Sequence, residues 1–248
     1  MNIYQFQKQN PEAVWETPPV DQVLQIGFEE MFCSLPGNCI DLVLTDPAYW
    51  TSNRWREMGT TARLGGHYDP SKRDEDKWFE TIDEGQFELL LHETYRVLKD
   101  CRFAYIMCDW QAIETVYRVA PDQCWEYWKP LVWDKVNLGM GYHYRASYEF
   151  VVLFQKGKAK LRDLTKGDVL HFPRVVNSYP TEKPLRLFEL LVKNATDEGD
   201  FVLDPFCGSG TTAAACHILN RHYLCGDVSK RAIEWTAKRL NALQAELV

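Results

Sequence analysis

Residues 201–212 read FVLDPFCGSGTT, and this stretch decides the fold class. An apolar run ends in Asp204 and continues through a glycine turn into an alanine-rich stretch that begins at Thr211. This order predicts a buried strand, a tight turn and a helix. Glycine lets a ligand approach the backbone because it has no Cβ, and a helix amino terminus presents unpaired N–H groups. Gly208 and Gly210 are therefore expected to border a ligand site.

The ligand class follows from the acidic residues around this turn. The pattern from Gly208 to Ala213 matches the loose dinucleotide signature G-x-G-x-x-A, but four residues separate Leu203 from the first glycine. The carboxylate of Asp204 would repel a pyrophosphate and attract a cation such as the sulfonium of S-adenosylmethionine. Asp227 ends the next apolar run, where a carboxylate can accept hydrogen bonds from a ribose. A cationic nucleoside is thus favoured over a dinucleotide.

Outward from this stretch, short β-rich runs alternate with helical stretches, which is typical of an α/β sheet protein. Pro184 suits a first helical turn and Ser229 suits a helix cap. Helices are predicted at 87–98, 184–192 and 229–243. The predicted strands number seven and span 22–26, 41–44, 103–107, 131–133, 149–154, 201–203 and 223–225.

Composition excludes several classes of protein. The 248 residues include 28 Lys and Arg against 35 Asp and Glu, a formal charge of −7 that excludes a uniformly basic nucleic-acid sleeve. A hydrophobic share of 46% with 25% charged residues is typical of globular chains, not of disordered ones. No apolar run approaches the roughly 18 residues that cross a bilayer. Residues 1–19 lack the apolar core of a secretory leader. We expect no membrane association and a cytoplasmic location.

The eight cysteines contain no C-x-x-C pair, so we expect reduced thiols within the core and no disulfide framework. A local group of Cys216, His217, His222 and Cys225 straddles a predicted helix end and a strand. That placement differs from a metal-binding knuckle, and we expect no metal site.

Two segments interrupt the alternation. Residues 50–85 form a polar stretch longer than an ordinary connection, which indicates a functional or mobile segment. Residues 135–180 contain eight Lys and Arg against three acidic residues, a net charge of +5 that leaves −12 for the rest. Such asymmetry can focus a polyanion onto one face of an acidic protein. A solvated basic hairpin is the alternative interpretation.

A second motif lies at 41–50, DLVLTDPAYW. Its apolar run delivers Asp46, Pro47 and Tyr49 to the carboxyl edge of the predicted sheet, where open α/β sheets bind ligands. Taken alone, the motif is explained equally well by a strand followed by an Asp-Pro turn. Together with the glycine turn, it favours a shared functional site.

These segments resemble amino-group DNA methyltransferases. DPAY at 46–49 is similar to the family's D-P-P-Y motif, and DPFCGSGTT at 204–212 is similar to its cofactor loop, D-P-F-x-G-S-G-T-T. RVLK at 96–99, the hairpin between 131 and 157 and PTEKP at 180–184 also resemble family motifs, in the family's order. The tyrosine motif precedes the cofactor loop, as in the permuted beta class.

The resemblance implies an α/β, Rossmann-like fold with a seven-stranded, mostly parallel sheet, helices on both faces and a permuted motif order. It implies a single catalytic domain over 1–248, with a catalytic half at 20–134, a hairpin and target-recognition segment at 135–180 and a cofactor half at 181–243. The implied cofactor is S-adenosyl-L-methionine, and the implied partner is DNA, with a homodimer left open. The expected location is the cytoplasm of a bacterium or a phage-infected host cell.

Site residues are carried over by the same resemblance. Asp46 and the Pro47 carbonyl would accept the hydrogens of an exocyclic amine, and Tyr49 would stack on a flipped base. The cofactor-binding residues would be Thr181, Lys183, Asp204, Phe206, Gly208, Gly210, Thr211 and Asp227, with Asp227 at the ribose. We expect a side chain added at Gly210 to obstruct the cofactor. Candidate contacts to phosphates or bases are Arg54, Arg56, Arg63 and Arg145.

Two departures from the family pattern leave alternatives open. Ala48 replaces the second proline, and Gly27-Phe28 stands where many family members have Gly-Asp facing the adenine. Adenine N6 is the favoured target because Asp at position 46 resembles the adenine-specific members, and cytosine N4 is the alternative. An RNA base or a protein amide could present similar geometry. A catalytically silent DNA-binding subunit is the rival from another class, and a dinucleotide oxidoreductase would leave residues 46–49 unexplained.

Overall fold

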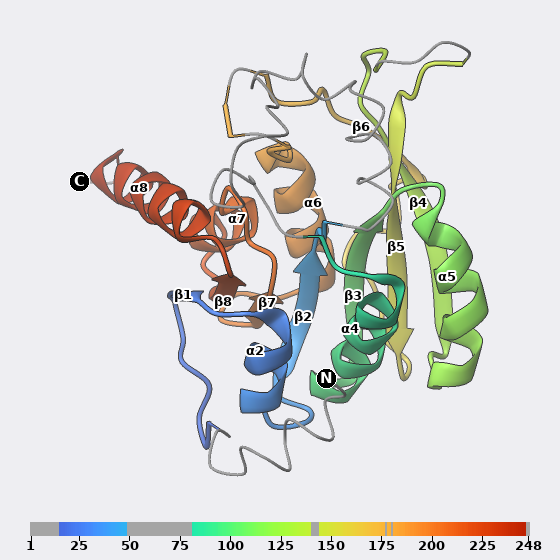
Figure 1. The fold of residues 1–248 in the computed structure, drawn as a ribbon, viewed down its shortest axis with the longest axis horizontal. Helices are drawn as coiled ribbons and strands as arrows, with labels where there is room; N and C mark the ends of the chain where they lie inside the picture. The colour runs from blue at the N-terminus through green and yellow to red at the C-terminus, as the bar shows by residue number, and fades with distance from the viewer. Residues whose placement is uncertain (1–14, 49–80, 140–143, 177, 180, 247–248) are drawn as a thin grey trace, which may run out of the picture.

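The structure is a computed structural model that describes residues 15–48, 81–139, 144–176, 178–179 and 181–246. One eight-stranded sheet runs through this part of the chain, in the order β1-β8-β7-β2-β3-β5-β4-β6 (Figure 1). Its strands are β1 (Gln22–Gln25), β2 (Ile40–Thr45), β3 (Leu98–Cys108), β4 (Tyr127–Asp134), β5 (Tyr148–Lys156), β6 (Val169–His171), β7 (Phe201–Asp204) and β8 (His222–Asp227).

The sheet is mostly parallel, as predicted. β1, β8, β7, β2 and β3 pair in parallel, whereas β5 runs antiparallel to both β3 and β4. The predicted number of strands is wrong by one, because β6 adds a parallel partner to β4. β6 has three residues, of which Leu170 is buried, and so short a run carries no distinctive hydrophobic period.

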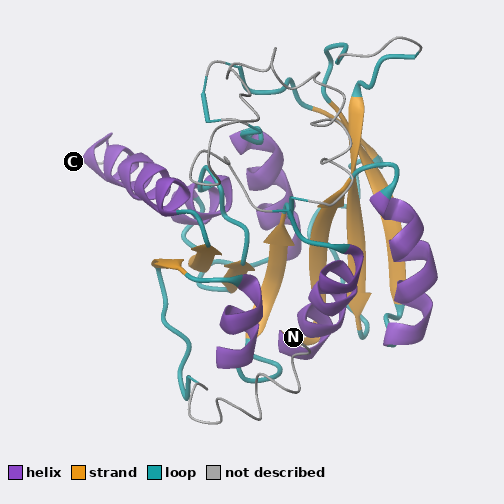
Figure 2. Cartoon of the chain, in the orientation of Figure 1, coloured by secondary structure: helices purple, strands orange, loops and turns teal. Residues whose placement is uncertain are grey.

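Helices cover both faces of the sheet (Figure 2). Apolar side chains of α2, α4 and α5 pack in one core cluster, and those of α6, α7 and α8 pack in the other. The predicted α/β class with helices on both faces is confirmed. The helices are α2 (Phe28–Ser34), α4 (Glu84–Val97), α5 (Ala112–Val119), the 3₁₀ helix η3 (Ala120–Gln123), α6 (Leu185–Ala195), α7 (Thr211–Ile218) and α8 (Lys230–Glu246).

β3 shows why the two cores form. Successive side chains of a strand point to opposite faces of the sheet. Ala104, Ile106 and Cys108 accordingly join the cluster beneath α2 and α4, and Tyr105 and Met107 join the cluster beneath α6 and α7. Because both faces are covered, the centre of this strand is a continuous apolar run without polar alternation.

The topology brings the two sequence motifs to one edge. β2 and β7 are parallel neighbours, with Val43 paired to Leu203. The chain leaves β2 toward β3 on one side and leaves β7 toward β8 on the other. Open α/β sheets bind ligands at such a switch point, outside the carboxyl ends of the strands. Asp46 and the glycine turn both follow these carboxyl ends.

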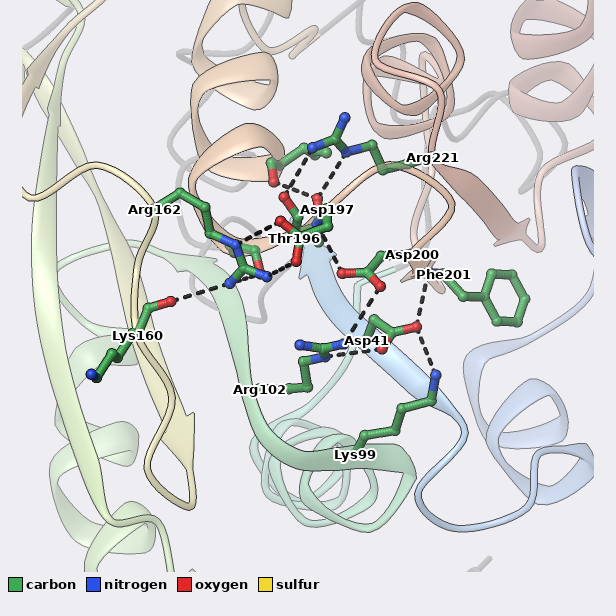
Figure 3. A network of polar contacts seen from close by, with 12 residues as sticks. Asp41, Lys99, Arg102, Lys160, Arg162, Thr196, Asp197, Asp200, Phe201 and Arg221 are labelled. Carbon is green, nitrogen blue, oxygen red and sulfur yellow. Dashed lines mark hydrogen bonds and ion pairs between the residues drawn. The ribbon is translucent and has the colours of Figure 1, made fainter.

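At the opposite edge, a polar network ties the strands together (Figure 3). The buried Asp41 carboxylate on β2 accepts hydrogen bonds from Lys99 Nζ at 2.8 Å, Arg102 Nε at 2.9 Å and the Phe201 N–H at 3.0 Å. Arg102 also contacts Asp200 at 3.5 Å. These bonds join β2, β3 and the start of β7, so this network of charged groups stabilises the sheet. Within the described residues, no helix is long and apolar enough to cross a membrane.

Candidate active site

Asp204 joins the strand β7 to its neighbours at the carboxyl edge. Its buried carboxylate accepts a 2.7 Å hydrogen bond from the Thr45 hydroxyl on β2 and another from Thr212 on α7. The Phe206 N–H donates to the same carboxylate at 3.1 Å. Burial raises the pKa of Asp204 to about 6, although the two threonine hydroxyls and the Phe206 N–H oppose that rise. The side chain therefore organises the loop from inside.

The glycine turn is built by two left-handed residues, Gly208 with φ +48° and Gly210 with φ +73°. The Gly208 N–H donates to Asp227 Oδ2 at 3.0 Å, and the Ser229 N–H donates to Asp227 Oδ1 at 2.8 Å. Asp227 thus sits against the turn at the end of β8, as the sequence predicts. A Cβ at Gly208 would lie 3.8 Å from Tyr179, an ordinary contact distance.

The structure requires glycine at position 210 for a different reason. A Cβ built there would lie 2.4 Å from Cγ2 and 2.6 Å from Oγ1 of Thr236, which belongs to α8. The expectation that a side chain at Gly210 would obstruct a cofactor stays a prediction, and the structure adds a separate obstacle, because α8 occupies the space beside this residue. Close packing of the helix against the turn, together with the positive φ, requires glycine here.

Two aromatic rings lie beside this edge. Phe206 packs on Phe28, with ring centroids 5.2 Å apart and planes inclined by 31°. Phe28 is the first residue of α2, directly after Gly27, and is itself buried. The departure at Gly27-Phe28 thus replaces a carboxylate by a ring that supports Phe206. Beside the start of α2, the half-buried Phe206 ring therefore rests on an apolar side chain.

Asp46 meets Lys183 just beyond the end of β2. The Lys183 ammonium donates to Asp46 Oδ2, and its Nζ lies 3.7 Å from Glu149 Oε2. Lys135 Nζ contacts the other oxygen of Glu149 at 2.5 Å. We call Asp46, Lys183, Glu149 and Lys135 the edge charge chain. Burial by itself lowers the pKa of Lys183, but Asp46 and Glu149 outweigh this effect and raise it.

The segment before α6 is fastened to the glycine turn. Thr211 is buried, and its hydroxyl donates to the Lys183 carbonyl at 3.3 Å. Arg239 of α8 donates to the Ser209 carbonyl at 3.2 Å and to Thr211 Oγ1 at 3.1 Å, and pairs with Glu182 at 3.1 Å. Thr211 thus links the segment before α6 and Arg239 of α8 to the glycine turn through its buried side chain.

Thr181 and Pro47 complete the described part of the predicted site. Thr181 is exposed, with a left-handed φ of +63°, and its carbonyl lies 3.4 Å from Lys183 Nζ. Pro47 is buried directly after Asp46. The structure therefore brings together Asp46, Pro47, Lys183 and the glycine turn at one edge.

The predicted base and DNA contacts are placed in part. Tyr49, Arg54, Arg56 and Arg63 lie outside the described residues. Arg145 is exposed, and its Nε donates to the Gly139 carbonyl at 2.6 Å, which braces the turn between β4 and β5. Part of the Arg145 guanidinium, which was expected to contact nucleic acid, is therefore engaged in this hydrogen bond.

The basic segment 135–180 does not form one charged face. Because β5 runs antiparallel to β3, Glu149 lies at the carboxyl edge, whereas Lys156 pairs with Arg102 in the register at the opposite edge. Lys156 is buried there and donates to Asn38 Oδ1 and the Leu98 carbonyl at 2.7 and 2.6 Å. Arg162 pairs with Asp197 near the same edge (Figure 3). The expectation that the net charge of +5 gathers on one face is therefore wrong, because the antiparallel direction of β5 places these charged residues at opposite edges of the sheet.

Several residues of this edge were given no role by the sequence, although Thr212 and Glu149 lie within segments that resemble family motifs. Thr45 and Thr212 hold Asp204, Arg239 and Thr236 brace the turn from α8, and Glu149 contacts Lys183. Only the adjacency of Thr45 to Asp46, and of Thr212 to the glycine turn, could have marked the first pair. The others depend on tertiary contacts. Among the described residues, no group of three or more His, Cys, Asp and Glu could hold a metal ion.

The cysteines are all unpaired. Five are buried, which agrees with core thiols, but Cys101 and Cys124 are exposed and Cys39 is half-buried. Cys101 lies within β3 and Cys124 directly follows η3, and both have positive φ, so the apolar character of their neighbours did not predict burial.

Comparison with known proteins identifies relatives of this arrangement. A family model described as DNA methylase, for N6 and N4 methyltransferases, matches residues 40–239. The type II methyltransferase M.HpaI of Haemophilus parainfluenzae is 28% identical over 237 residues, covering 84% of this chain and 70% of its own length.

Solved structures show the same fold at low sequence identity. The cytosine-N4-specific PvuII DNA methyltransferase superposes with a TM-score of 0.67 at 14% identity, covering 90% of this chain and 87% of its own. The complex of M1.HpyAVI with S-adenosylmethionine gives a TM-score of 0.59 at 19% identity, covering 88% and 98%.

Proposed function

Since the chain belongs to the DNA methylase family of N6 and N4 methyltransferases, we propose that it transfers a methyl group from S-adenosylmethionine to the N6 amine of adenine in DNA. The observation that carries the proposal is the meeting of Asp46 and the glycine turn at one edge. The Thr45–Asp204 hydrogen bond joins the strands that deliver them. Methyl transfer requires an acceptor for the amine and a donor site side by side.

The residues present fit the proposed cofactor. Asp227 offers a carboxylate at the end of β8, beside the open approach to Gly208. The Phe206–Phe28 pair offers an apolar surface for a purine ring, and Lys183 offers a cation for a carboxylate. When bound, S-adenosylmethionine supplies an electrophilic methyl group on a sulfonium. Asp227, Phe206 and Lys183 would bind and orient it.

The acceptor side of the reaction depends on Asp46 and Pro47. An exocyclic amine delocalises its lone pair into the base, which makes it a poor nucleophile. Hydrogen bonds from that amine to the Asp46 carboxylate and the Pro47 carbonyl would favour a tetrahedral nitrogen with its lone pair directed at the methyl group. The methylated amine then loses a proton to Asp46 or to solvent. No covalent intermediate with the protein is needed.

The choice of base is the finer part of the proposal. Asp at position 46 supports adenine through its resemblance to adenine-specific family members. The fold similarity to a cytosine-N4-specific enzyme keeps cytosine N4 as the second candidate. Tyr49 would stack on the extruded base, worth roughly 1–3 kcal/mol and comparable to the cost of extrusion.

The deciding experiment is incubation of the purified protein with DNA and methyl-labelled S-adenosylmethionine, followed by mass spectrometry of the nucleosides. Labelled N6-methyl-2′-deoxyadenosine is the expected product. N4-methylcytosine would correct the base, and label in RNA or protein with none in DNA would overturn the substrate. DNA binding with no label in any polymer would support the silent-subunit alternative.

A further inference from the structure

Glu149 has no assigned part in the proposed reaction, yet it lies next to the catalytic edge. It is the second residue of β5, and its partner in β4 is Trp133. The following residue, Phe150, pairs with Cys108 at the carboxyl end of β3. The antiparallel direction of β5 therefore carries Glu149 to the edge where Asp46 leaves β2.

The edge charge chain alternates in sign. Asp46 holds the Lys183 ammonium, Lys183 lies 3.7 Å from Glu149 Oε2, and Lys135 contacts Glu149 Oε1 at 2.5 Å. The Trp133 ring lies beneath both ammonium groups, with its centroid 5.4 Å from Lys135 Nζ and 6.0 Å from Lys183 Nζ. Two carboxylates thus share one buried lysine.

The contact between Glu149 and Lys183 is not an optimised structural ion pair. A separation of 3.7 Å is too long for a hydrogen bond, and Glu149 Oε2 is buried without a hydrogen-bond partner. Burial alone would raise the pKa of Glu149, but the charges of Lys183 and Lys135 keep it below the usual value. Glu149 is therefore a carboxylate that acts on Lys183 through its charge.

Other described groups also act on this edge. Asp204, from β7, and Cys108, from β3, both feel the negative charge of Asp46, which raises the pKa of each. These groups are acidic or neutral, so they do not replace Lys183 as a cation beside Asp46. The electrostatic environment of Asp46 therefore depends on Lys183 and on the negative charges of Asp204 and Glu149.

We propose that Glu149 is a positioning residue for methyl transfer: by sharing the Lys183 ammonium, it weakens the hold of Lys183 on Asp46 and leaves Asp46 a stronger acceptor for the target amine. A cation held between two carboxylates stabilises each one less than a cation devoted to one. The inference rests on the proposed function, because the target amine is the group that Asp46 would accept.

The test compares wild type with Glu149→Gln and with Asp134→Asn as matched control. Asp134 is an acid on the adjacent strand that pairs with His171 and lies outside the chain of charges. In Glu149→Gln, Asp46 is the one carboxylate of the edge charge chain that remains beside Lys183. We expect the acid limb of the pH profile of kcat to move down by about half a pH unit and kcat to fall several-fold, with KM for DNA within about twofold.

A second measurement uses the ligand-free protein. The carboxyl carbon of Asp46, labelled with carbon-13 and assigned with Asp46→Asn, is titrated by NMR. Its midpoint should fall in Glu149→Gln, rise in Lys183→Met and stay near wild type in Asp134→Asn. Opposite shifts from two neighbouring substitutions are not expected from a general loss of structure. Glu149→Asp keeps the charge and should restore most of the wild-type behaviour.

The outcomes separate the two proposals. A wild-type protein without methyl transfer would contradict the proposed function, while the NMR titration would still test the coupling. An unchanged Asp46 midpoint in Glu149→Gln, an equal shift in Asp134→Asn, or a shifted midpoint with an unchanged kcat profile would overturn the positioning role. If Glu149→Gln does not fold, the Asp46 midpoint is measured in Lys135→Met, where Glu149 keeps Lys183 as its only cation within the edge charge chain and the midpoint should rise; an unchanged midpoint there would overturn the positioning role.

Discussion

The Thr45 hydroxyl donates a 2.7 Å hydrogen bond to the buried carboxylate of Asp204, across 159 positions of the chain. Thr45 is the last residue of β2 and directly precedes Asp46, and Asp204 is the last residue of β7 and directly precedes the cofactor turn. Together with the pairing of β2 and β7, this bond therefore sets the spacing between Asp46 and the glycine turn. Its loss should affect stability and geometry together.

Thr45→Val tests that bond. The substitution removes one donor from a buried carboxylate, so we expect the free energy of unfolding to fall by about 1–3 kcal/mol. Because the Thr45 hydroxyl opposes the rise in the pKa of Asp204, that pKa should rise further. Denaturant unfolding at several pH values measures both effects. The raised pKa means that the ionised form of Asp204 destabilises the fold relative to the protonated form. The loss of stability in Thr45→Val should therefore be largest above about pH 6, where Asp204 is ionised.

Thr94→Val is the matched control. Thr94 is equally buried, but its hydroxyl has no hydrogen-bond partner in the described structure. Replacing an unsatisfied hydroxyl by a methyl group should leave the stability unchanged or raise it. Equal losses in the two variants would refute a specific role for the Thr45–Asp204 bond.

Asp46→Ala should abolish methyl transfer while cofactor binding persists. The carboxylate is proposed to polarise the amine, and removing such a group costs at least about 10²–10³-fold in rate. Methyl incorporation into DNA measures the rate, and calorimetry with S-adenosylhomocysteine measures binding. Asp134→Asn should retain wild-type turnover. Undiminished transfer by Asp46→Ala would remove the basis of the proposed mechanism.

Gly210→Ala should destabilise the protein through α8. The added Cβ would lie 2.4 Å from Thr236 Cγ2 and would also force a left-handed φ on alanine. Strain and overpacking each cost about 1–3 kcal/mol. Gly199 has a similar φ of +80°, and a Cβ added there would meet no atom within 4 Å. Gly199→Ala therefore measures the cost of the left-handed backbone conformation alone. Thermal unfolding should therefore show a larger loss for Gly210→Ala, and equal losses would exclude a contribution from the Thr236 contact.

Asp41→Asn probes the network at the far edge. Burial raises the pKa of Asp41, but hydrogen bonds from Lys99, the Phe201 N–H and Arg102 outweigh it and lower the pKa below 3.8. A depressed folded-state pKa adds stability above the unfolded-state value, and this stability disappears as the pH falls through the folded-state value. We expect a loss of roughly 1.5–3 kcal/mol near neutral pH.

The same substitution should matter less in acid. The difference in unfolding free energy between wild type and Asp41→Asn should shrink below about pH 4, where the unfolded chain binds the proton. Asp168→Asn breaks an exposed pair with Lys129 and should leave the free energy of unfolding nearly unchanged at any pH. A difference independent of pH would contradict the charged role of Asp41.

Periodicity and turn chemistry predicted most of the fold. The strands β2, β3, β5 and β7 contain apolar runs that stand out, and the predicted helices correspond to α4, α6, α7 and α8. β6 was missed because it has only two consecutive apolar residues, Val169 and Leu170, fewer than the shortest runs predicted as strands. The α5 helix and the antiparallel direction of β5 also had no distinct local signal.

Local sequence by itself determined the α/β class, the family and the positions of Asp46 and the glycine turn, because each follows from neighbouring residues and their spacing. Tertiary structure alone decided that α8 fills the space beside Gly210, that the basic segment is divided between two edges, and that Glu149 reaches Lys183. The physical reason is the same in all three cases. These relationships depend on strand direction and on contacts between side chains far apart in the chain, which no local pattern encodes.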